Sequence, residues 1–425
     1  MGNFFGKTFL TALAVMTLFS ADCYAFGYGG VWGNTGNILE DEEIPKETEA
    51  TSAETKPVQN YDISEQTTPA EPAFSRNSLE NGADIPATGE NMQTSENKFS
   101  ESKKKKSEKI VDNTDSKYSY DDMREDIDKL IIKYPKLVRA EVIGTTADKR
   151  KIYDIIIGNE KADRQIVIQA GCHGREYMTC LLVMDMAEYY LQGYDRISYN
   201  DRLLSDYFKD FQIHIVPMLN PDGVTISQLG AKGLKNPQLR KNVAVMYKNA
   251  VTYGYTNYSE AQYFERWKAN AHGVDINRNF NGRWGMAEEL KCPTGWGYKG
   301  TSPESEAESR AITKLIDSLS DPVTVISYHA TGSVVWWDYA QQGNFRNRCY
   351  SEAKLISHMT GYKLNPYDKT SCAGLCDRII AKGGGKTVPI LIEIGQGECP
   401  LDISEYPEIF RKNYRLIPVL MDMYR

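Results

Sequence analysis

The hydrophobic positions of residues 118–425 follow helical and strand periods in turn. Residues 118–134 carry apolar side chains at helical spacing and stop before Pro135, which predicts an amphipathic helix. Short runs rich in β-branched residues, bounded by turn-forming residues, predict strands. The expected strands are 139–144, 151–158, 165–170, 211–219, 323–328, 334–337 and 388–394, and the further expected helices are 178–191, 304–319, 345–359 and 404–424.

This alternation of strands and helices predicts an α/β fold. We expect a single domain, residues 118–425, with a mixed, largely parallel central sheet flanked by helices on both faces. Residues 26–117 differ, because Glu, Thr, Ser, Lys, Asn and Pro dominate there and large apolar residues are sparse. Such a segment cannot bury enough apolar surface to offset its chain entropy, so it is predicted to be a disordered linker.

The first 25 residues have the layout of a secretory signal peptide. Lys7 precedes an apolar run over residues 9–19, and small residues lead to Ala25. The run is much shorter than the roughly 20 apolar residues that cross a bilayer, so no membrane span is expected. We therefore expect a secreted, extracytoplasmic protein at the cell wall. The net charge of −7 argues against nucleic acid as a partner.

Two strand ends carry side chains that can bind a metal. His173 and Glu176 follow the apolar run 166–168, and His329 follows the predicted strand 323–328. Because the carboxyl ends of parallel strands open onto one edge of a sheet, these three residues are expected to converge there. Two imidazole nitrogens and one carboxylate leave a fourth position open, as a hydrolytic zinc site requires. The prediction is one Zn²⁺ per chain.

A carboxylate within an apolar strand is the candidate base. Glu393 lies in the run 389–394, among Ile and Leu, where a carboxylate is costly to bury unless it is paired or functional. Beside a zinc-activated water it would act as a general base.

The loop 272–280 offers a set of polar groups. Arg278 and Asn277 stand side by side, which suits capture of a carboxylate by a forked guanidinium and an amide. Asp275 is a candidate hydrogen-bond partner that would hold His173 in the tautomer needed for metal binding.

Six motifs then indicate a family. They are HGRE (173–176), NPDG (220–223), RWKANAHGVDINRNF (266–280), SYHATG (327–332), AGLCD (373–377) and LIEIG (391–395). In this order they resemble the zinc carboxypeptidases of the carboxypeptidase A and T type, and the resemblance spans the whole globular part. It implies that His173, Glu176 and His329 are the zinc ligands, that Glu393 is the general base and acid, and that Asn277 and Arg278 bind the terminal carboxylate of the substrate.

Two roles of the family have more than one candidate here. The family uses an arginine to polarise the scissile carbonyl, and the matching segment offers Lys268 or Arg266. For the tyrosine that closes over the substrate, Tyr367 is nearest in sequence and Tyr362 is the alternative.

Several details resemble one branch, the γ-D-glutamyl-meso-diaminopimelate peptidases, which trim cell-wall stem peptides. Cys376 and Arg378 depart from that branch, because Lys and Trp flank its counterpart of Asp377. The resemblance implies a secreted zinc peptidase, expected to be a monomer, that cleaves peptidoglycan stem peptides at the γ-D-Glu–meso-diaminopimelate bond. The alternatives are a general metallocarboxypeptidase that releases C-terminal L-amino acids and, from another class, a catalytically inactive wall-binding module.

Overall fold

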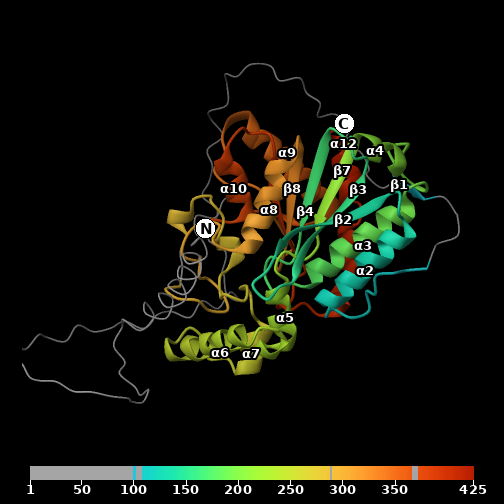
Figure 1. The fold of residues 1–425 in the computed structure, drawn as a ribbon. Coiled ribbons are helices and arrows are strands. Elements are labelled where there is room, and N and C mark those ends of the chain that lie inside the picture. Colours follow the sequence, from blue (N-terminus) through green and yellow to red (C-terminus); the bar gives the residue numbers. More distant parts are fainter. Residues whose placement is uncertain (1–98, 102–107, 288–289, 366–371) are drawn as a thin grey trace, which may run out of the picture. The chain divides into compact units, whose positions relative to one another are not determined.

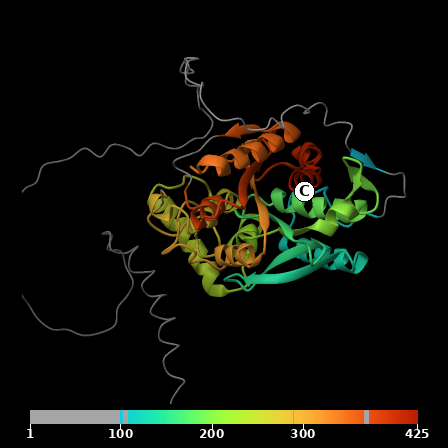
Figure 2. The ribbon, with the colours of Figure 1, turned by 90° about the horizontal axis from the view of Figure 1, so that it is seen from above.

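A mixed sheet organises the chain in the computed structural model, which describes residues 99–101, 108–287, 290–365 and 372–425 (Figure 1). Its eight strands are β2 (Val138–Thr145), β3 (Lys151–Gly158), β4 (Arg164–Gln169), β7 (Phe211–Val216), β8 (Pro322–Ala330), β9 (Val334–Trp336), β10 (Lys363–Asn365) and β11 (Val388–Ile394). They stand in the order β10-β9-β11-β8-β4-β7-β3-β2. Figure 2 gives the view of the fold from above. Strands β11, β8, β4 and β7 are mutually parallel. The pairs β11-β9, β7-β3 and β3-β2, which lie nearer the edges of the sheet, are antiparallel. The predicted mixed, largely parallel sheet is confirmed.

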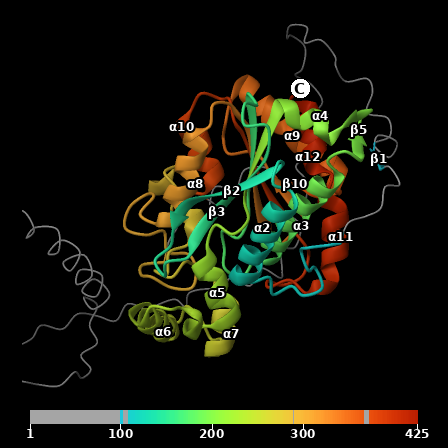
Figure 3. The same cartoon turned by 45° about the vertical axis from the view of Figure 1, so that its right-hand side comes forward.

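Helices cover both faces of this sheet, as predicted (Figure 3). Successive residues of a strand point to opposite faces, so Ile166 and Ile168 join one hydrophobic cluster and Val167 joins another. The helices of the first cluster are α2 (Tyr120–Lys133), α3 (Met178–Gly193), α4 (Leu204–Asp210), α9 (Gly343–Thr360), α11 (Tyr406–Asn413) and α12 (Leu416–Met423). Helices α8 (Ala307–Ser318) and α10 (Leu375–Lys382) pack on the other face.

A small helical lobe follows β7, in a stretch to which the sequence pattern assigned no element. It contains α5 (Pro221–Leu229), α6 (Pro237–Thr252) and α7 (Glu260–Glu265), which lie together in Figure 1. Their apolar side chains form one cluster with the buried Trp267. The NPDG motif (220–223) forms the N-cap and first turn of α5. The Asn220 side chain accepts a hydrogen bond from the Gly223 N–H, and Pro221 occupies the first helical position, where it needs no N–H partner.

The predicted closing helix over residues 404–424 is wrong as a continuous element. A short 3-10 turn (Ile403–Glu405) leads into α11, and the chain breaks before α12. Pro418 explains the break, because its ring would clash with the carbonyl of residue 414 in an unbroken helix. The Tyr414 carbonyl accepts a hydrogen bond from the Tyr190 hydroxyl instead, at 2.9 Å.

A segment that we call the strap, residues 108–117, is bound to helix α3. The main-chain N–H groups of Ile110 and Val111 each donate to the Glu188 carboxylate at 2.8 Å. Lys109 Nζ lies 3.0 Å from Asp185 Oδ2, and the Val111 side chain is fully buried. The contacts of the folded body therefore begin upstream of the boundary expected at residue 117.

Before the strap, β1 (Phe99–Glu101) pairs with β5 (Ile197–Tyr199), which also pairs with β6 (Arg202–Leu203). The predicted signal peptide and most of the predicted linker lie outside the described residues. In the part of the chain that the structure describes, no helix combines the length and apolar character needed to cross a bilayer. The seven cysteines of the folded body are buried thiols.

Glu352 gives the folded body a pH-dependent stability that can be measured. Burial raises the pKa of this carboxyl to about 7, although Thr324 and Tyr424 donate hydrogen bonds to it. Between its unfolded pKa, about 4.5, and its folded pKa, the folded state holds a proton that the unfolded state has lost, so stability falls as the pH rises through this window. Glu352→Gln removes this titration.

We expect the free energy of unfolding of Glu352→Gln, relative to that of the unsubstituted protein, to rise by about 1–3 kcal/mol between pH 5 and pH 8. Urea unfolding at several pH values measures this difference, in which the contributions of other titrating groups cancel. An equal difference at pH 5 and pH 8 would contradict the assignment.

Candidate metal centre and active site

Three neighbouring strands bring the candidate metal ligands and base together. In the sheet order β11-β8-β4, His173 lies just beyond the end of β4, and His329 is the penultimate residue of β8. Glu393 is the register partner of His329 on β11. The carboxyl edge of the parallel strands therefore carries all three residues, as expected from the sequence.

His173, Glu176 and His329 form a buried cluster with the geometry of a metal site. Their ligand atoms all lie within 4.8 Å of one another. The two Nδ1 atoms are 3.2 Å apart, and the Glu176 oxygens lie 2.7 Å from His173 Nδ1 and 3.0 Å from His329 Nδ1. Two imidazole nitrogens and a carboxylate that converge in this way fit a divalent cation, with a position left for substrate or water.

Asp275 fixes the orientation of the first histidine. Its Oδ1 lies 3.2 Å from His173 Nε2, which leaves Nδ1 directed at the cluster. Its Oδ2 accepts a hydrogen bond from the Gly297 N–H at 3.1 Å and lies 3.6 Å from Arg278 Nε. Burial disfavours the charged carboxylate, but the charge and hydrogen bond of His173, together with Arg278, hold the pKa of Asp275 well below its usual range.

Glu393 stands beside the cluster without belonging to it. Its Oε2 atom is buried and has no hydrogen-bond partner among the described residues. Burial, followed by the charge of Glu176, raises the pKa of Glu393 to about 8. A cation bound to His173, Glu176 and His329 would favour the carboxylate form and lower that pKa, toward the range of a general base at neutral pH.

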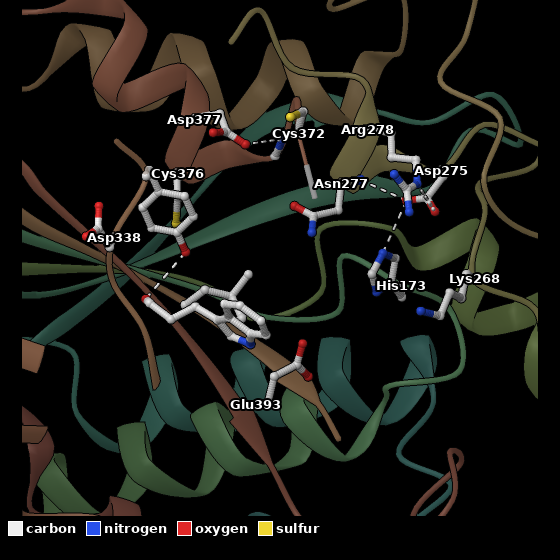
Figure 4. A pocket seen from close by; sticks show the side chains of 14 residues that line it. His173, Lys268, Asp275, Asn277, Arg278, Asp338, Cys372, Cys376, Asp377 and Glu393 are labelled. Carbon is white, nitrogen blue, oxygen red and sulfur yellow. Dashed lines mark hydrogen bonds and ion pairs between the residues drawn. The ribbon is translucent and has the colours of Figure 1, made fainter. Parts of the chain in front are cut away.

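A cavity of about 160 Å³ opens from these residues (Figure 4). His173, Lys268 and Glu393 line one end of it, and the candidate carboxylate clamp, Asn277 with Arg278, lines its wall. The clamp depends on the AGLCD motif, because a Cβ added to Gly374 would lie 2.8 Å from Asn277 Oδ1.

The opposite end of the cavity is polar and charged. Asp338, Cys376 and Asp377 line it (Figure 4). Asp377 Oδ1 accepts a hydrogen bond from Arg283 Nε at 2.9 Å, and Asp338 Oδ2 accepts one from an Arg346 NH2 group at 2.7 Å. Each of these two carboxylates is therefore paired with an arginine.

A match to a protein-family model identifies the family of this chain. The protein-family model Peptidase_M14, described as zinc carboxypeptidase, matches residues 123–379, which is more than half of the chain. The chain belongs to the zinc carboxypeptidase family. Zinc is the metal that this family uses, and the buried His-Glu-His cluster can hold one such ion. The protein is therefore a zinc-dependent peptide hydrolase by family.

Individual zinc carboxypeptidase relatives differ in the reactions that their names describe. Gamma-D-glutamyl-L-diamino acid endopeptidase 1 of Lysinibacillus sphaericus is 27% identical over 304 residues, which are 71% of this chain and 71% of that protein. Mast cell carboxypeptidase A of Homo sapiens is 26% identical over 270 residues, 63% of this chain and 58% of that protein. Bovine thrombin-activatable fibrinolysis inhibitor, solved with a tick carboxypeptidase inhibitor, matches with a TM-score of 0.54 at 17% identity, over 72% of this chain and 96% of that one. This last likeness shows a shared fold.

The structure separates the two candidates for the carbonyl-polarising cation of the zinc carboxypeptidases. Lys268 lines the cavity beside His173 and Glu393. Arg266 does not line it, because its guanidinium pairs with Glu398 at 2.7 Å. Both residues belong to an irregular segment, in which sequence spacing does not determine the direction of a side chain.

The candidates for the substrate-capping tyrosine differ in another way. Tyr362 is buried in the core, where its hydroxyl accepts a hydrogen bond from the Asn413 amide at 3.1 Å, so it does not reach the cavity in this conformation. Tyr367 lies outside the described residues, and its role stays a prediction.

Several residues that line the cavity lie outside both the expected site residues and the six family motifs. They are Trp336, Asp338, Tyr339 and Cys372. Trp336 lies in the short apolar run that begins at Val334, soon after SYHATG, and Asp338 and Tyr339 follow that run, so their position just beyond a ligand-bearing strand was the available signal.

Proposed function

We propose that this protein is an exported zinc peptidase that hydrolyses the γ-D-Glu–meso-diaminopimelate bond of peptidoglycan stem peptides. The observation that carries the proposal is the charged end of the cavity, lined by Asp338 and Asp377. The side chain of meso-diaminopimelate ends in an ammonium and a carboxylate, so a pocket that offers acidic groups shared with arginines suits it better than an apolar side chain. The Lysinibacillus sphaericus relative, by its name, acts on a γ-D-glutamyl-L-diamino acid bond.

The residues of the site divide the chemistry between them. When bound, zinc supplies a Lewis acid that polarises the scissile carbonyl and makes water more acidic. Glu393 accepts the proton of the attacking water and passes it to the leaving amine. Lys268 donates a hydrogen bond to the carbonyl oxygen as negative charge develops there. Arg278 and Asn277 hold the carboxylate of the departing amino acid.

Export and monomeric action belong to the same proposal. The predicted signal peptide over residues 1–25 supports export. Export would bring the enzyme to its proposed substrate, which lies outside the cytoplasm. Nothing in the site as we describe it requires a second copy of the chain, since the candidate ligands, the base and the clamp all come from one chain.

A second candidate function is release of C-terminal L-amino acids from ordinary peptides. The human mast cell carboxypeptidase A relative favours it, as does the carboxylate clamp, which any C-terminal residue could use. An inactive wall-binding module is disfavoured, because Glu393 and the His-Glu-His cluster are all present and close together.

Product analysis distinguishes these functions. Purified residues 26–425, loaded with zinc, are incubated in parallel with L-Ala-γ-D-Glu-meso-diaminopimelate and with a blocked dipeptide that ends in an L-amino acid. Release of diaminopimelate from the first substrate alone, detected by mass spectrometry, is the expected result. Cleavage of the dipeptide alone would favour the general carboxypeptidase, and cleavage of neither with zinc bound would favour the binding module.

A further inference from the structure

A cavity that we call the second cavity lies at the amino ends of two strands whose carboxyl ends carry the metal centre and the base. Its volume is about 290 Å³, and it is lined where β8 begins, at Pro322, and just before β11. Helix α10 connects the two cavities, because Cys376 and Asp377 line the active-site cavity and Lys382 lines the second one. The second cavity is therefore separate from the active site, and the proposed chemistry does not use it.

One part of its wall is apolar. The apolar residues that line it come from α8, α9, α10 and the segment before β8, and they are Ile316, Leu319, Pro322, Phe345 and Ile379. Pockets that hold small organic molecules have volumes from roughly 300 Å³ upward. The second cavity therefore has the space and the apolar surface for the carbon part of a small ligand.

The rest of the wall carries cations. Arg378, Lys382 and Lys386 line it, together with a single carboxylate, that of Asp317. Asp317 Oδ1 accepts a hydrogen bond from an Arg378 NH1 group at 2.7 Å and also pairs with Lys382. Lys386 is exposed and has no ion-pair partner in the part of the chain that the structure describes. One cation of the wall is thus available to a ligand.

A loop of three glycines adds main-chain donors beside these cations. Gly383, Gly384 and Gly385 have φ angles of 82°, 89° and 55°, which glycine adopts without strain. A Cβ added to Gly383 or Gly384 would meet no atom within 4 Å, so the space outside the loop is open. Arg348 donates to the carbonyls of Gly385 and Lys386 at 2.9 and 2.6 Å, whereas the N–H groups of Gly384 and Gly385 donate to no described residue. Free N–H groups in turns commonly bind anions.

The charges around the second cavity do not cancel. The hydrogen bond from Arg378 lowers the pKa of Asp317, which is therefore ionised, and Glu304 lies 3.6 Å from Arg378 Nε. The C-terminal ends of α8 and α10 each add about half a negative charge. Arg348 and the three lining cations exceed this sum by about one positive charge. An anion is therefore the favoured ligand.

We propose that the second cavity binds an organic phosphate, whose phosphate group contacts Lys382, Lys386 and the glycine loop and whose carbon part packs on the apolar wall. A phosphate accepts several hydrogen bonds at once, which suits two ammonium groups and the neighbouring main-chain N–H groups. The group can belong to a free phosphate monoester or to a phosphodiester unit of a polymer. This inference goes beyond the proposed function and does not depend on the peptide substrate.

Isothermal titration calorimetry of zinc-loaded residues 26–425 tests it. The probes are phenyl phosphate, inorganic phosphate and poly(glycerol phosphate), with phenol as the uncharged control. Phenyl phosphate should bind more tightly than inorganic phosphate, and phenol should not bind. Lys386→Gln should weaken the binding of phenyl phosphate about tenfold, and Lys382→Gln combined with Lys386→Gln should weaken it about 100-fold, as expected for hydrogen bonds to charged groups. Tighter binding of the polymer per phosphate than of phenyl phosphate would identify the polymer as the source of the group.

Lys354→Gln is the matched control, because it removes an exposed lysine of α9 that does not line the second cavity. The affinity for phenyl phosphate should be unchanged in it. The double variant should fold, since both of its lysines are exposed, and its kcat/KM for the stem peptide should equal that of the unsubstituted enzyme. Phosphate binding that persists in the double variant but disappears when zinc is removed would place the phosphate at the metal centre and overturn the inference. Absence of binding by all three phosphates would overturn it too, whatever the outcome of the cleavage experiment.

Discussion

Glu393→Gln should leave zinc bound and lower kcat by about 10²–10⁴-fold, the usual contribution of a general base. The glutamine amide has nearly the same shape as the carboxylate, but it cannot accept the proton of the attacking water. Because Glu393 lies outside the His-Glu-His cluster, the metal should remain at one ion per chain, which elemental analysis measures.

His329→Ala provides the contrasting control. Removing one imidazole of the cluster should lower both the zinc content and the activity, whereas Glu393→Gln should lower only the activity. Full turnover by the zinc-loaded Glu393→Gln protein would contradict the assignment of the base. Loss of zinc from it would instead make Glu393 a determinant of metal binding.

A chain that begins at Tyr118 should be less stable than one that begins at Glu108 by about 3–5 kcal/mol, because hydrogen bonds to two carboxylates and the burial of one apolar side chain are lost. The shorter chain keeps every predicted helix and strand but lacks the strap. Glu188 then loses the N–H donors of Ile110 and Val111, and the Asp185 carboxylate, which is 95% shielded from solvent, loses Lys109. Asp185 keeps the Tyr406 hydroxyl and Glu188 keeps the Gln192 amide as donors, so the loss consists of the charge-assisted hydrogen bonds from the strap and the burial of Val111.

Urea unfolding of the two chains measures this difference. A chain that begins at residue 26 serves as the control, and it should unfold at nearly the same urea concentration as the chain that begins at Glu108. Coincident midpoints for the chains that begin at Glu108 and at Tyr118 would show that the strap contributes no stability.

The strap also shows where hydropathy patterns mislead. Residues 108–117 resemble a linker because polar residues dominate them, yet they supply hydrogen-bond donors to acids on the face of α3 that turns away from solvent. The signal lay in α3 itself, since Asp185 and Glu188 interrupt a helix that otherwise reads as fully buried. Two acids in such a helix require partners, and sequence alone does not say which segment provides them.

More of the candidate site than of the structure around it could be predicted from the sequence. His173, His329 and Glu393 were identifiable because each follows or interrupts an apolar strand, and strand order places their ends together. The choice between Lys268 and Arg266 could not be made, because both lie in irregular backbone. The break before α12 was missed because the apolar spacing continues through Pro418, whereas the backbone cannot.

Asp275 joins the metal cluster and the carboxylate clamp through a single side chain. One of its oxygens faces His173, and the other faces Arg278. When a substrate carboxylate pairs with the Arg278 guanidinium, that guanidinium neutralises less of the negative charge of Asp275. More of this charge then acts on the imidazole of His173, which makes His173 a better metal ligand. On the proposed role of Arg278, substrate binding and metal affinity are thermodynamically linked. The factor by which zinc raises the affinity for a C-terminal carboxylate equals the factor by which that carboxylate raises the affinity for zinc.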